Sequence, residues 1–282
     1  MDLTITPTKL HGAVTPPPSK SQAHRLLIAA ALSGGVSTIH NLADSQDIAA
    51  TRRCLAALGA RIDELGENTV QVHGLGNAVV EAGPAPILDC GESGSTLRFL
   101  IPLALLVNGE AAFTGHGRLM ERPLKPYEDL FREKGIAWKW ENGRLTVDGG
   151  RGYGDCALAP GAYRLPGNVS SQFFTGLLFV LPLLDGDSTL VPTTPLESRD
   201  YLEMTRQALA AAGVTTRWAD ENTLCVPGGQ AYQPFTATAE ADWSQAGFWY
   251  AADFLDSQVE IRGLDPDSAQ GDKVVKIGRA HV

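Results

Sequence analysis

Apolar runs of helix length recur four times along the chain, and each follows a turn rich in serine or glycine. A glycine or an aspartate and then a strand pattern come after each run. The copies read SKSQAHRLLIAAALSGGVSTIHNL from Ser19, GESGSTLRFLIPLALLVNGEAAFTG from Gly91, GNVSSQFFTGLLFVLPLLDGDSTLV from Gly167 and ADWSQAGFWYAADFLDSQVEIRGL from Ala241. This spacing of roughly 75 residues predicts a repeat protein.

A second, amphipathic helix pattern follows in three of the copies, and a glycine ends each one. The patterns are DIAATRRCLAALGARI, KPYEDLFREKGIAWKW and RDYLEMTRQALAAAGVTTRW, with Gly59, Gly135 and Gly213 as the expected caps. Two alternating strand patterns, separated by EN or ENG, then predict a hairpin. The repeated unit is therefore β-α-β-α-β-β, and the fold class is α/β (α+β).

Short strands are also expected before the first helix of the later copies, at residues 87–90 (ILDC), 155–160 (DCALAP) and 235–240 (FTATAE). The fourth copy ends early, because SAQGDKVV from Ser268 stands where its second helix should begin. We therefore expect a complete three-repeat domain at 20–239, an incomplete second domain made of 1–19 and 240–275, and a C-terminal truncation.

The last seven residues, 276–282 (KIGRAHV), are expected to be foreign, because IGRAHV is what a common sequencing adapter gives when translated. The nucleotide sequence would test this expectation.

Composition excludes several classes of protein. With 44% apolar residues in 282, the chain can bury a sizeable core, and its net charge of −9 argues against the basic face that nucleic acid requires. Cys54, Cys90, Cys156 and Cys225 lack the spacing of a zinc site or a disulfide framework. Neither a secretion signal nor an apolar stretch of the roughly 20 residues that span a membrane is present, so a cytoplasmic protein is expected.

The turn before the first apolar run carries groups that suit an anion. Lys20, Ser21 and Arg25 lie within six residues, at a helix start whose N–H groups are free. The alternative is that Ser19 or Ser21 only caps the helix and that the two cations are solvated.

The second copy offers a Gly/Ser turn in which Gly94 allows close approach of backbone to a ligand, with Arg98 one helical turn later. Arg118 and Arg122, in GRLMERP, follow the next strand and could reach the same face. Alternatively the turn is purely structural, and the arginines form surface ion pairs with neighbours such as Glu121.

The third copy supplies neutral donors, Ser170, Ser171 and Gln172, and Ser198 and Tyr201 follow in ESRDY. Hydroxyl groups of this kind suit a phosphorylated polyol, and capping explains only one of the adjacent serines.

Other chemistries lack their motifs. The sequence contains no GxGxxG after a strand, no GxxxxGK[ST], no HExxH and no GxSxG. Asp242 is expected to cap the fourth helix rather than to catalyse, and His24 is expected to lie on a helix surface without a metal partner.

These motifs resemble those of one family. PPPSKSQAHRLLIAAALSGG is similar to the N-terminal signature of the EPSP synthases, and GESGSTLRFL, GRLMERP and NVSSQFFTGLL are similar to three further blocks in the same order. The resemblance covers residues 7 to about 275. It implies an inside-out barrel fold of two domains, each with three β-α-β-α-β-β units, with one complete here and part of the second.

The resemblance also implies an activity: transfer of the enolpyruvyl group of phosphoenolpyruvate to the 5-hydroxyl of shikimate 3-phosphate, with release of phosphate, by a monomer without metal or organic cofactor. The residues implied to surround shikimate 3-phosphate are Lys20, Ser21, Arg25, Ser170, Ser171, Gln172, Ser198 and Tyr201. Those implied to face phosphoenolpyruvate are Lys20, Gly94, Arg118 and Gln172.

Two departures from the family pattern stand out. Glu92 occupies a position where many members have asparagine, next to the expected phosphoenolpyruvate site. The family's proton-transferring residues match nothing up to residue 282, so catalytic residues stay unassigned, and the resemblance implies weak shikimate 3-phosphate binding without turnover by this chain. Gly94 matches the glycine at which members bind glyphosate, which implies sensitivity of the intact enzyme.

Two rival functions stay open. UDP-N-acetylglucosamine enolpyruvyltransferase shares the architecture, although a Lys-Asn start would be expected in place of Lys20-Ser21. A non-catalytic repeat scaffold would use the Ser-rich turns only as caps.

Overall fold

The computed structural model describes residues 6–76, 84–150 and 158–275. Its helices are α1 (Lys20–Leu32), α2 (Gln46–Ala57), α3 (Gly94–Asn108), α4 (Lys125–Glu133), α5 (Ser171–Val180), α6 (Arg199–Ala211) and α7 (Trp243–Phe254), with the 3-10 helices η1 (Leu119–Glu121), η2 (Leu181–Leu183) and η3 (Gly271–Val274). Its strands are β1 (His11–Val14), β2 (Val36–His40), β3 (Arg61–Gly66), β4 (Thr69–His73), β5 (Ile87–Asp89), β6 (Glu110–Thr114), β7 (Ala137–Glu141), β8 (Arg144–Asp148), β9 (Ala162–Leu165), β10 (Ser188–Pro192), β11 (Arg217–Trp218), β12 (Leu224–Val226), β13 (Thr236–Thr238) and β14 (Gln258–Ile261).

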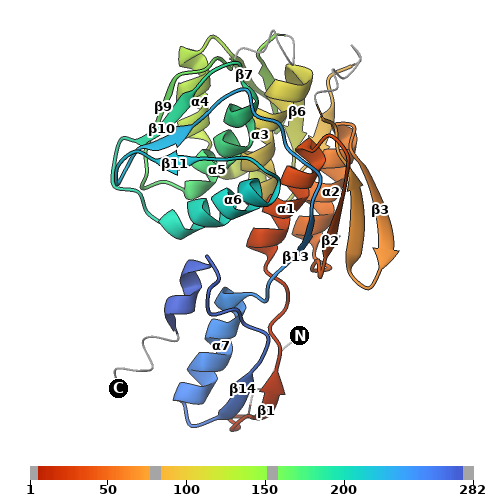
Figure 1. Cartoon of the computed structure of the whole chain (residues 1–282), viewed down its shortest axis with the longest axis vertical. Helices are drawn as coiled ribbons and strands as arrows, with labels where there is room; N and C mark the ends of the chain where they lie inside the picture. Colours follow the sequence, from red (N-terminus) through yellow and green to blue (C-terminus); the bar gives the residue numbers. More distant parts are fainter. Residues whose placement is uncertain (1–5, 77–83, 151–157, 276–282) are drawn as a thin grey trace.

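Three four-stranded sheets share one topology, as the repeat predicted. Their strand orders are β13-β2-β4-β3, β5-β6-β8-β7 and β9-β10-β12-β11. In each, the first pair is parallel and an antiparallel hairpin completes the sheet. The sheets lie outside and the helices between them (Figure 1), so the expected α/β fold with repeated β-α-β-α-β-β units is confirmed.

The strand at FTATAE exists, but its partner differs from the one expected. It was assigned to the fourth copy, whereas β13 pairs in parallel with β2 and completes the sheet of the first copy. The corresponding place beside β14 is taken by β1, which pairs with it in parallel from the other end of the chain. Chain order misled here, because a parallel strand needs a neighbour in space rather than in sequence.

The strand expected at 155–160 was misplaced. Residues 155–157 lie outside the described residues, 158–160 form no strand, and β9 begins at Ala162. Within β9, Tyr163 and Leu165 alternate into the core at 0% and 1% exposure, while the strand pairs with β10. Four residues are too few for the alternating pattern to be recognised from the sequence. The tail 276–282 and Cys156 also lie outside the described residues.

Helix ends and hairpins follow the expected turn chemistry. Gly59, Gly135 and Gly213 each follow the C-cap residue of α2, α4 and α6, with φ of 108°, 75° and 77°, which only glycine adopts at little cost. In the β7–β8 hairpin Asn142 and Gly143 both have positive φ, as a two-residue hairpin turn requires.

The central helices α1, α3 and α5 are buried almost throughout, which explains why their sequences are apolar on every face. No helix among the described residues is long and apolar enough to cross a bilayer. Part of the chain lies apart from the three sheets: β1, β14, α7 and η3 form a second group, joined to the first by two chain crossings (Figure 1). The domain boundaries 20–239 and 1–19 with 240–275 stay a prediction.

The crossing of α3 and α5 depends on Gly176. A Cβ atom there would lie 2.6 Å from the Arg98 carbonyl oxygen and still closer to the Tyr127 hydroxyl. Gly176→Ala gains about 1 kcal/mol of helix propensity, but the overpacking costs more, so we expect a net loss of about 1–2 kcal/mol in urea unfolding. Gly247→Ala in α7 is the matched control, because its Cβ meets nothing within 4 Å. Equal or greater stability of Gly176→Ala would contradict this reading of the helix crossing.

Candidate functional site

The first helix of each repeat has a side-chain cap at its N-terminus. The caps are Ser19, Ser93, Ser170 and Asp242, which accept hydrogen bonds from backbone N–H groups of the first turn. The expected cap role of Asp242 is confirmed by its 3.0 Å bond from the Gln245 N–H. A cap satisfies only one of the free N–H groups, so each helix start keeps its partial positive charge.

Four helix starts meet at one cavity of about 320 Å³, those of α1, α3, α5 and α6. Its lining is mostly hydroxyl, amide and guanidinium groups, and comprises Ser21, Arg25, Ser95, Phe99, Val169, Ser170, Ser171, Gln172, Glu197, Ser198 and Tyr201. Seven of the ten predicted site residues are among them: Ser21, Arg25, Ser170, Ser171, Gln172, Ser198 and Tyr201. The cavity therefore offers many donors and a concentration of helix dipoles to an anion.

Arg25 is the cation of this cavity, and its side chain is held without any carboxylate. Only 2% of the residue is exposed, and its Nε donates to the Thr205 hydroxyl at 2.9 Å. Its other nitrogens donate to the carbonyl oxygens of Ser21 and Tyr201 and to the Thr175 hydroxyl. Burial lowers the pKa of Arg25 to about 10, so it stays charged at neutral pH. A buried cation with neutral partners favours an anionic ligand.

Ser198 is the residue before α6 and adopts a left-handed conformation with φ of 58°. Its side chain makes no capping hydrogen bond, unlike the serines before α1, α3 and α5. Non-glycine residues in this region carry a cost of about 1–2 kcal/mol. Ser198 lines the cavity, and its hydroxyl does not cap its own helix, which leaves it available to a ligand.

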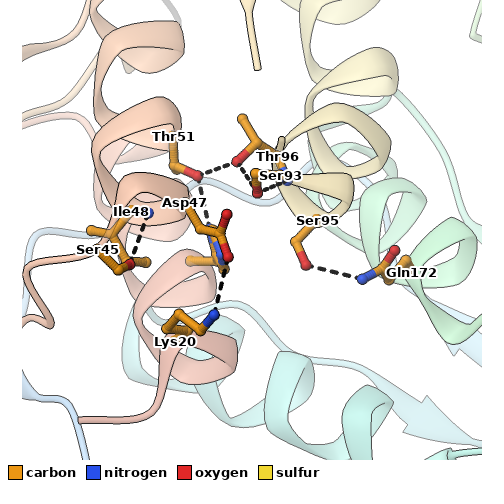
Figure 2. A network of polar contacts seen from close by, with 10 residues as sticks. Lys20, Ser45, Asp47, Ile48, Thr51, Ser93, Ser95, Thr96 and Gln172 are labelled. Atoms are coloured by element: carbon orange, nitrogen blue, oxygen red, sulfur yellow. Dashed lines mark hydrogen bonds and ion pairs between the residues drawn. The ribbon is translucent and has the colours of Figure 1, made fainter. Parts of the chain in front are cut away.

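Lys20 lies at an adjoining cavity of about 240 Å³, which shares Ser21 and Tyr201 with the first. Its Nζ pairs with Asp47 of α2 at 3.1 Å, and nearly half of the side chain is exposed (Figure 2). Burial, and next the charge of Asp272, raise the pKa of Tyr201 on the wall between the two cavities.

Gln172 is oriented by two residues of α3 that were not among the predicted ligands. Its amide oxygen accepts from Arg98 at 2.6 Å. Its amide nitrogen donates to Ser95 at 2.9 Å (Figure 2). Ser95 stands two residues after its cap, as Ser21 and Gln172 do after theirs, so alignment of the repeats could have found it. Phe99, Val169 and Glu197 carry no such signal.

Gly94 lines neither cavity but lies against two arginines. A Cβ atom there would be 2.6 Å from a nitrogen of Arg122 and 3.6 Å from one of Arg98. Neither arginine forms an ion pair with a described residue, and burial followed by the charge of Arg122 lowers the pKa of Arg98. A second cluster of positive charge thus stands beside the start of α3.

Arg118 is not brought into either cavity. Its side chain is 90% exposed and pairs with Glu121 at 3.1 Å, the alternative that the sequence left open. The carboxylate of Glu92 lies against Gly117, next to Arg118 along the chain, rather than in the two cavities.

A buried polar chain joins the starts of α1, α2 and α3. The Thr96 hydroxyl donates to the Ser93 hydroxyl at 2.7 Å, so it must accept from the Thr51 hydroxyl, also at 2.7 Å (Figure 2). Because the proton of Thr51 is used in this way, the Thr51 oxygen accepts from Nδ1 of His24 at 2.7 Å. Nδ1 of His24 therefore carries a proton. The surface position expected for His24 is wrong, because only 3% of the residue is exposed in this packed helix bundle. Burial, and next the charge of Arg25, lower the pKa of His24 to about 3. Among the described residues no group of three or more His, Cys, Asp or Glu side chains could hold a metal ion.

Comparison with known proteins decides the family. The family described as EPSP synthase (3-phosphoshikimate 1-carboxyvinyltransferase) matches residues 5–281. The chain belongs to the EPSP synthase family. Among curated relatives, the 3-phosphoshikimate 1-carboxyvinyltransferases of Clostridium kluyveri and Clostridium beijerinckii are 44% and 42% identical over 97% of this chain. The chain spans 62% of the length of each.

Solved EPSP synthase structures share the fold. An EPSP synthase from Acinetobacter baumannii superposes with a TM-score of 0.71 at 23% identity, over 86% of this chain and 52% of that one. A second structure from the same organism gives the same TM-score at 24% identity. The EPSP synthase-like architecture implied by the resemblance is therefore confirmed.

The neutral state of His24 makes stability depend on pH. The folded pKa of about 3 lies below the unfolded value of 6.5, so between these values only the unfolded chain binds the proton. Stability should be full above pH 6.5 and fall as the pH drops toward 3. Urea unfolding should show a loss of about 2 kcal/mol between about pH 6.5 and about pH 5.

His24→Gln should remove this slope, whereas His40→Gln on β2 should retain it. If the slope is the same in His24→Gln as in the unmodified chain, His24 is not its source.

Proposed function

We propose that the protein of which this chain forms part transfers the enolpyruvyl group of phosphoenolpyruvate to the 5-hydroxyl of shikimate 3-phosphate and releases phosphate. Family membership supports the reaction, and the names of the curated relatives favour shikimate 3-phosphate over a UDP-sugar as acceptor. We also propose that it works in the cytoplasm and as a monomer.

The observation that carries this proposal is the cavity at the four helix starts. Among the described residues that line the cavity, Arg25 is the one cation, and it is buried. Hydroxyl groups of the lining surround it. A phosphorylated polyol matches this set, because its phosphate pairs with the guanidinium and its ring hydroxyls with Ser171, Ser198 and Tyr201. Lys20, Ser21, Ser170 and Gln172 complete the proposed shikimate 3-phosphate site, as the family resemblance implies.

For phosphoenolpyruvate we propose Lys20, Gly94, Arg118 and Gln172. Lys20 and Gln172 border the shikimate 3-phosphate cavity or its neighbour, and Gly94 stands beside Arg98 and Arg122. Arg118 would have to leave Glu121 to take part, an exchange that costs little for so exposed a pair. Fixed cations and donors then hold two mutually repelling anions together while a proton is transferred.

Ser198 separates binding from stability. Ser198→Gly removes the hydroxyl and relieves the left-handed strain, so the unfolding midpoint should not fall. The affinity for shikimate 3-phosphate should drop roughly tenfold, the value of one hydrogen bond to a polar ligand, as measured by calorimetry. Asn142→Gly is the matched control, with φ of 51° in the β7–β8 turn. Unchanged affinity in Ser198→Gly would remove Ser198 from the site.

Shikimate 3-phosphate binding tests both the role of Lys20 and the alternative of a repeat scaffold. Lys20→Met should weaken shikimate 3-phosphate binding by about tenfold and reduce its salt dependence, because one phosphate contact is lost. Lys139→Met is the control, since Lys139 is also exposed and pairs with one carboxylate, Glu141. Equal binding by both variants and the unmodified chain would remove Lys20 from the site. No binding by the unmodified chain at millimolar ligand would contradict the proposed substrate and favour the scaffold, in which these turns are only caps.

A further inference from the structure

Two chain crossings connect the three-sheet part with the group formed by β1, α7, β14 and η3, and they lie side by side. The N–H of Ser19 donates to the Glu240 carbonyl at 2.8 Å, and the N–H of Asp242 donates to the Pro17 carbonyl at 2.9 Å. Pro18 and Ala241 form an antiparallel bridge between them. Ser19, the N-cap of α1, is therefore hydrogen-bonded to the segment that leads into α7.

The carboxylate of Glu240 is the centre of a polar cluster at this crossing. One oxygen accepts from the Gln22 amide at 2.9 Å, and the other accepts from the Ser268 hydroxyl and from the Gln270 amide at 3.1 Å. In return, the amide oxygen of Gln22 accepts from the Glu240 N–H at 2.6 Å. No described cation forms an ion pair with Glu240. We call Gln22, Glu240, Ser268 and Gln270 the Glu240 clamp.

Gln270 extends the clamp to the start of α7. It is only 4% exposed, its amide oxygen accepts from the Trp243 N–H at 3.0 Å, and its amide nitrogen also donates to the Ala241 carbonyl at 3.0 Å. Its own N–H donates to the Ser268 hydroxyl. Every member of the clamp therefore has a defined donor or acceptor role.

We propose that Glu240 is a positioning residue for substrate binding, which holds the start of α1 against α7 and η3. The second cavity has Lys20, Ser21 and Tyr201 on one wall and Asp242, Gln245 and Asp272 on the other. The clamp sets the spacing of these two walls, because Gln22 follows Lys20 and Ser21 directly and Gln270 precedes η3. This inference rests on the proposed function, since Lys20 and Ser21 are proposed to touch substrate.

With glutamine at position 22, a carboxylate is required at position 240 because three donors converge on its two oxygens. An amide has one acceptor oxygen and one donor nitrogen, so in Glu240→Gln a donor faces either Gln22 or the pair of Ser268 and Gln270. In Gln22→Glu, two carboxylates face each other.

The exchange of both groups restores every bond. In the double variant the new amide at 240 donates to the new carboxylate at 22, and its oxygen still accepts from Ser268 and Gln270. The carboxylate at 22 still accepts from the backbone N–H at 240.

The test is a double-mutant cycle on the full 282-residue chain. Calorimetry should show that Glu240→Gln and Gln22→Glu each weaken shikimate 3-phosphate binding about fivefold or more, and that the double variant returns to within about twofold of the unmodified chain. Glu260→Gln removes an exposed carboxylate of β14 that pairs with Arg262, and it should leave the affinity for shikimate 3-phosphate unchanged. Amide exchange should quicken at the first turn of α1 in the single variants only.

The outcomes separate this inference from the proposed function. If the unmodified chain binds shikimate 3-phosphate and the single variants bind equally well, the clamp does not position the site. Weakened single variants without recovery in the double variant would also overturn the inference, because loss of structure rather than loss of the matched pair would explain them. If the unmodified chain does not bind shikimate 3-phosphate, the proposed function fails, and Glu240 cannot position a site for that substrate. The amide exchange rates then report only whether the clamp orders the start of α1.

Discussion

The free N–H groups of helix first turns are the constraint on which the site depends. A helix cannot satisfy these groups internally, and here four helices direct them to one cavity. Serine caps take up one group each at α1, α3 and α5, whereas Ser198 before α6 leaves its helix uncapped by a side chain. The helix dipoles add to the charge of Arg25, so positive charge is concentrated at the cavity although the chain carries a net charge of −9.

Two adjacent residues of α1 hold the surrounding helices together in opposite ways. His24 points to α2 and α3 through Thr51 and Thr96 and is neutral, while Arg25 points to α5 and α6 through Thr175 and Thr205 and is charged. Both use threonine hydroxyls as neutral partners. These contacts connect the helices without a carboxylate that would pair with Arg25. The same burial keeps His24 neutral but leaves Arg25 charged, because the intrinsic pKa of arginine is much higher.

Most of the repeat could be predicted from the sequence because its signals are local. Apolar runs, glycine caps such as Gly59 and the Asn142-Gly143 turn each specify structure within a few residues, and β2 through β8 followed. The partner of β13 could not be predicted, because parallel pairing depends on distance in space, and β9 was too short to show its period. The helix starts predicted Ser21, Arg25 and Ser171, which the structure brings to one cavity. Arg98 was noted beside Gly94, but its bond to Gln172 of another repeat could not be predicted from local sequence.

The pairing of β13 with β2 has a consequence for synthesis on the ribosome. One edge of β2 stays without its partner until residues 236–238 have emerged, roughly 200 residues later, which takes tens of seconds at about 5–20 residues per second. During that time the nascent polypeptide exposes an unpaired strand edge of the kind that recruits other strands. Attachment of β13 therefore covers the open edge of β2 and completes the sheet of the first repeat.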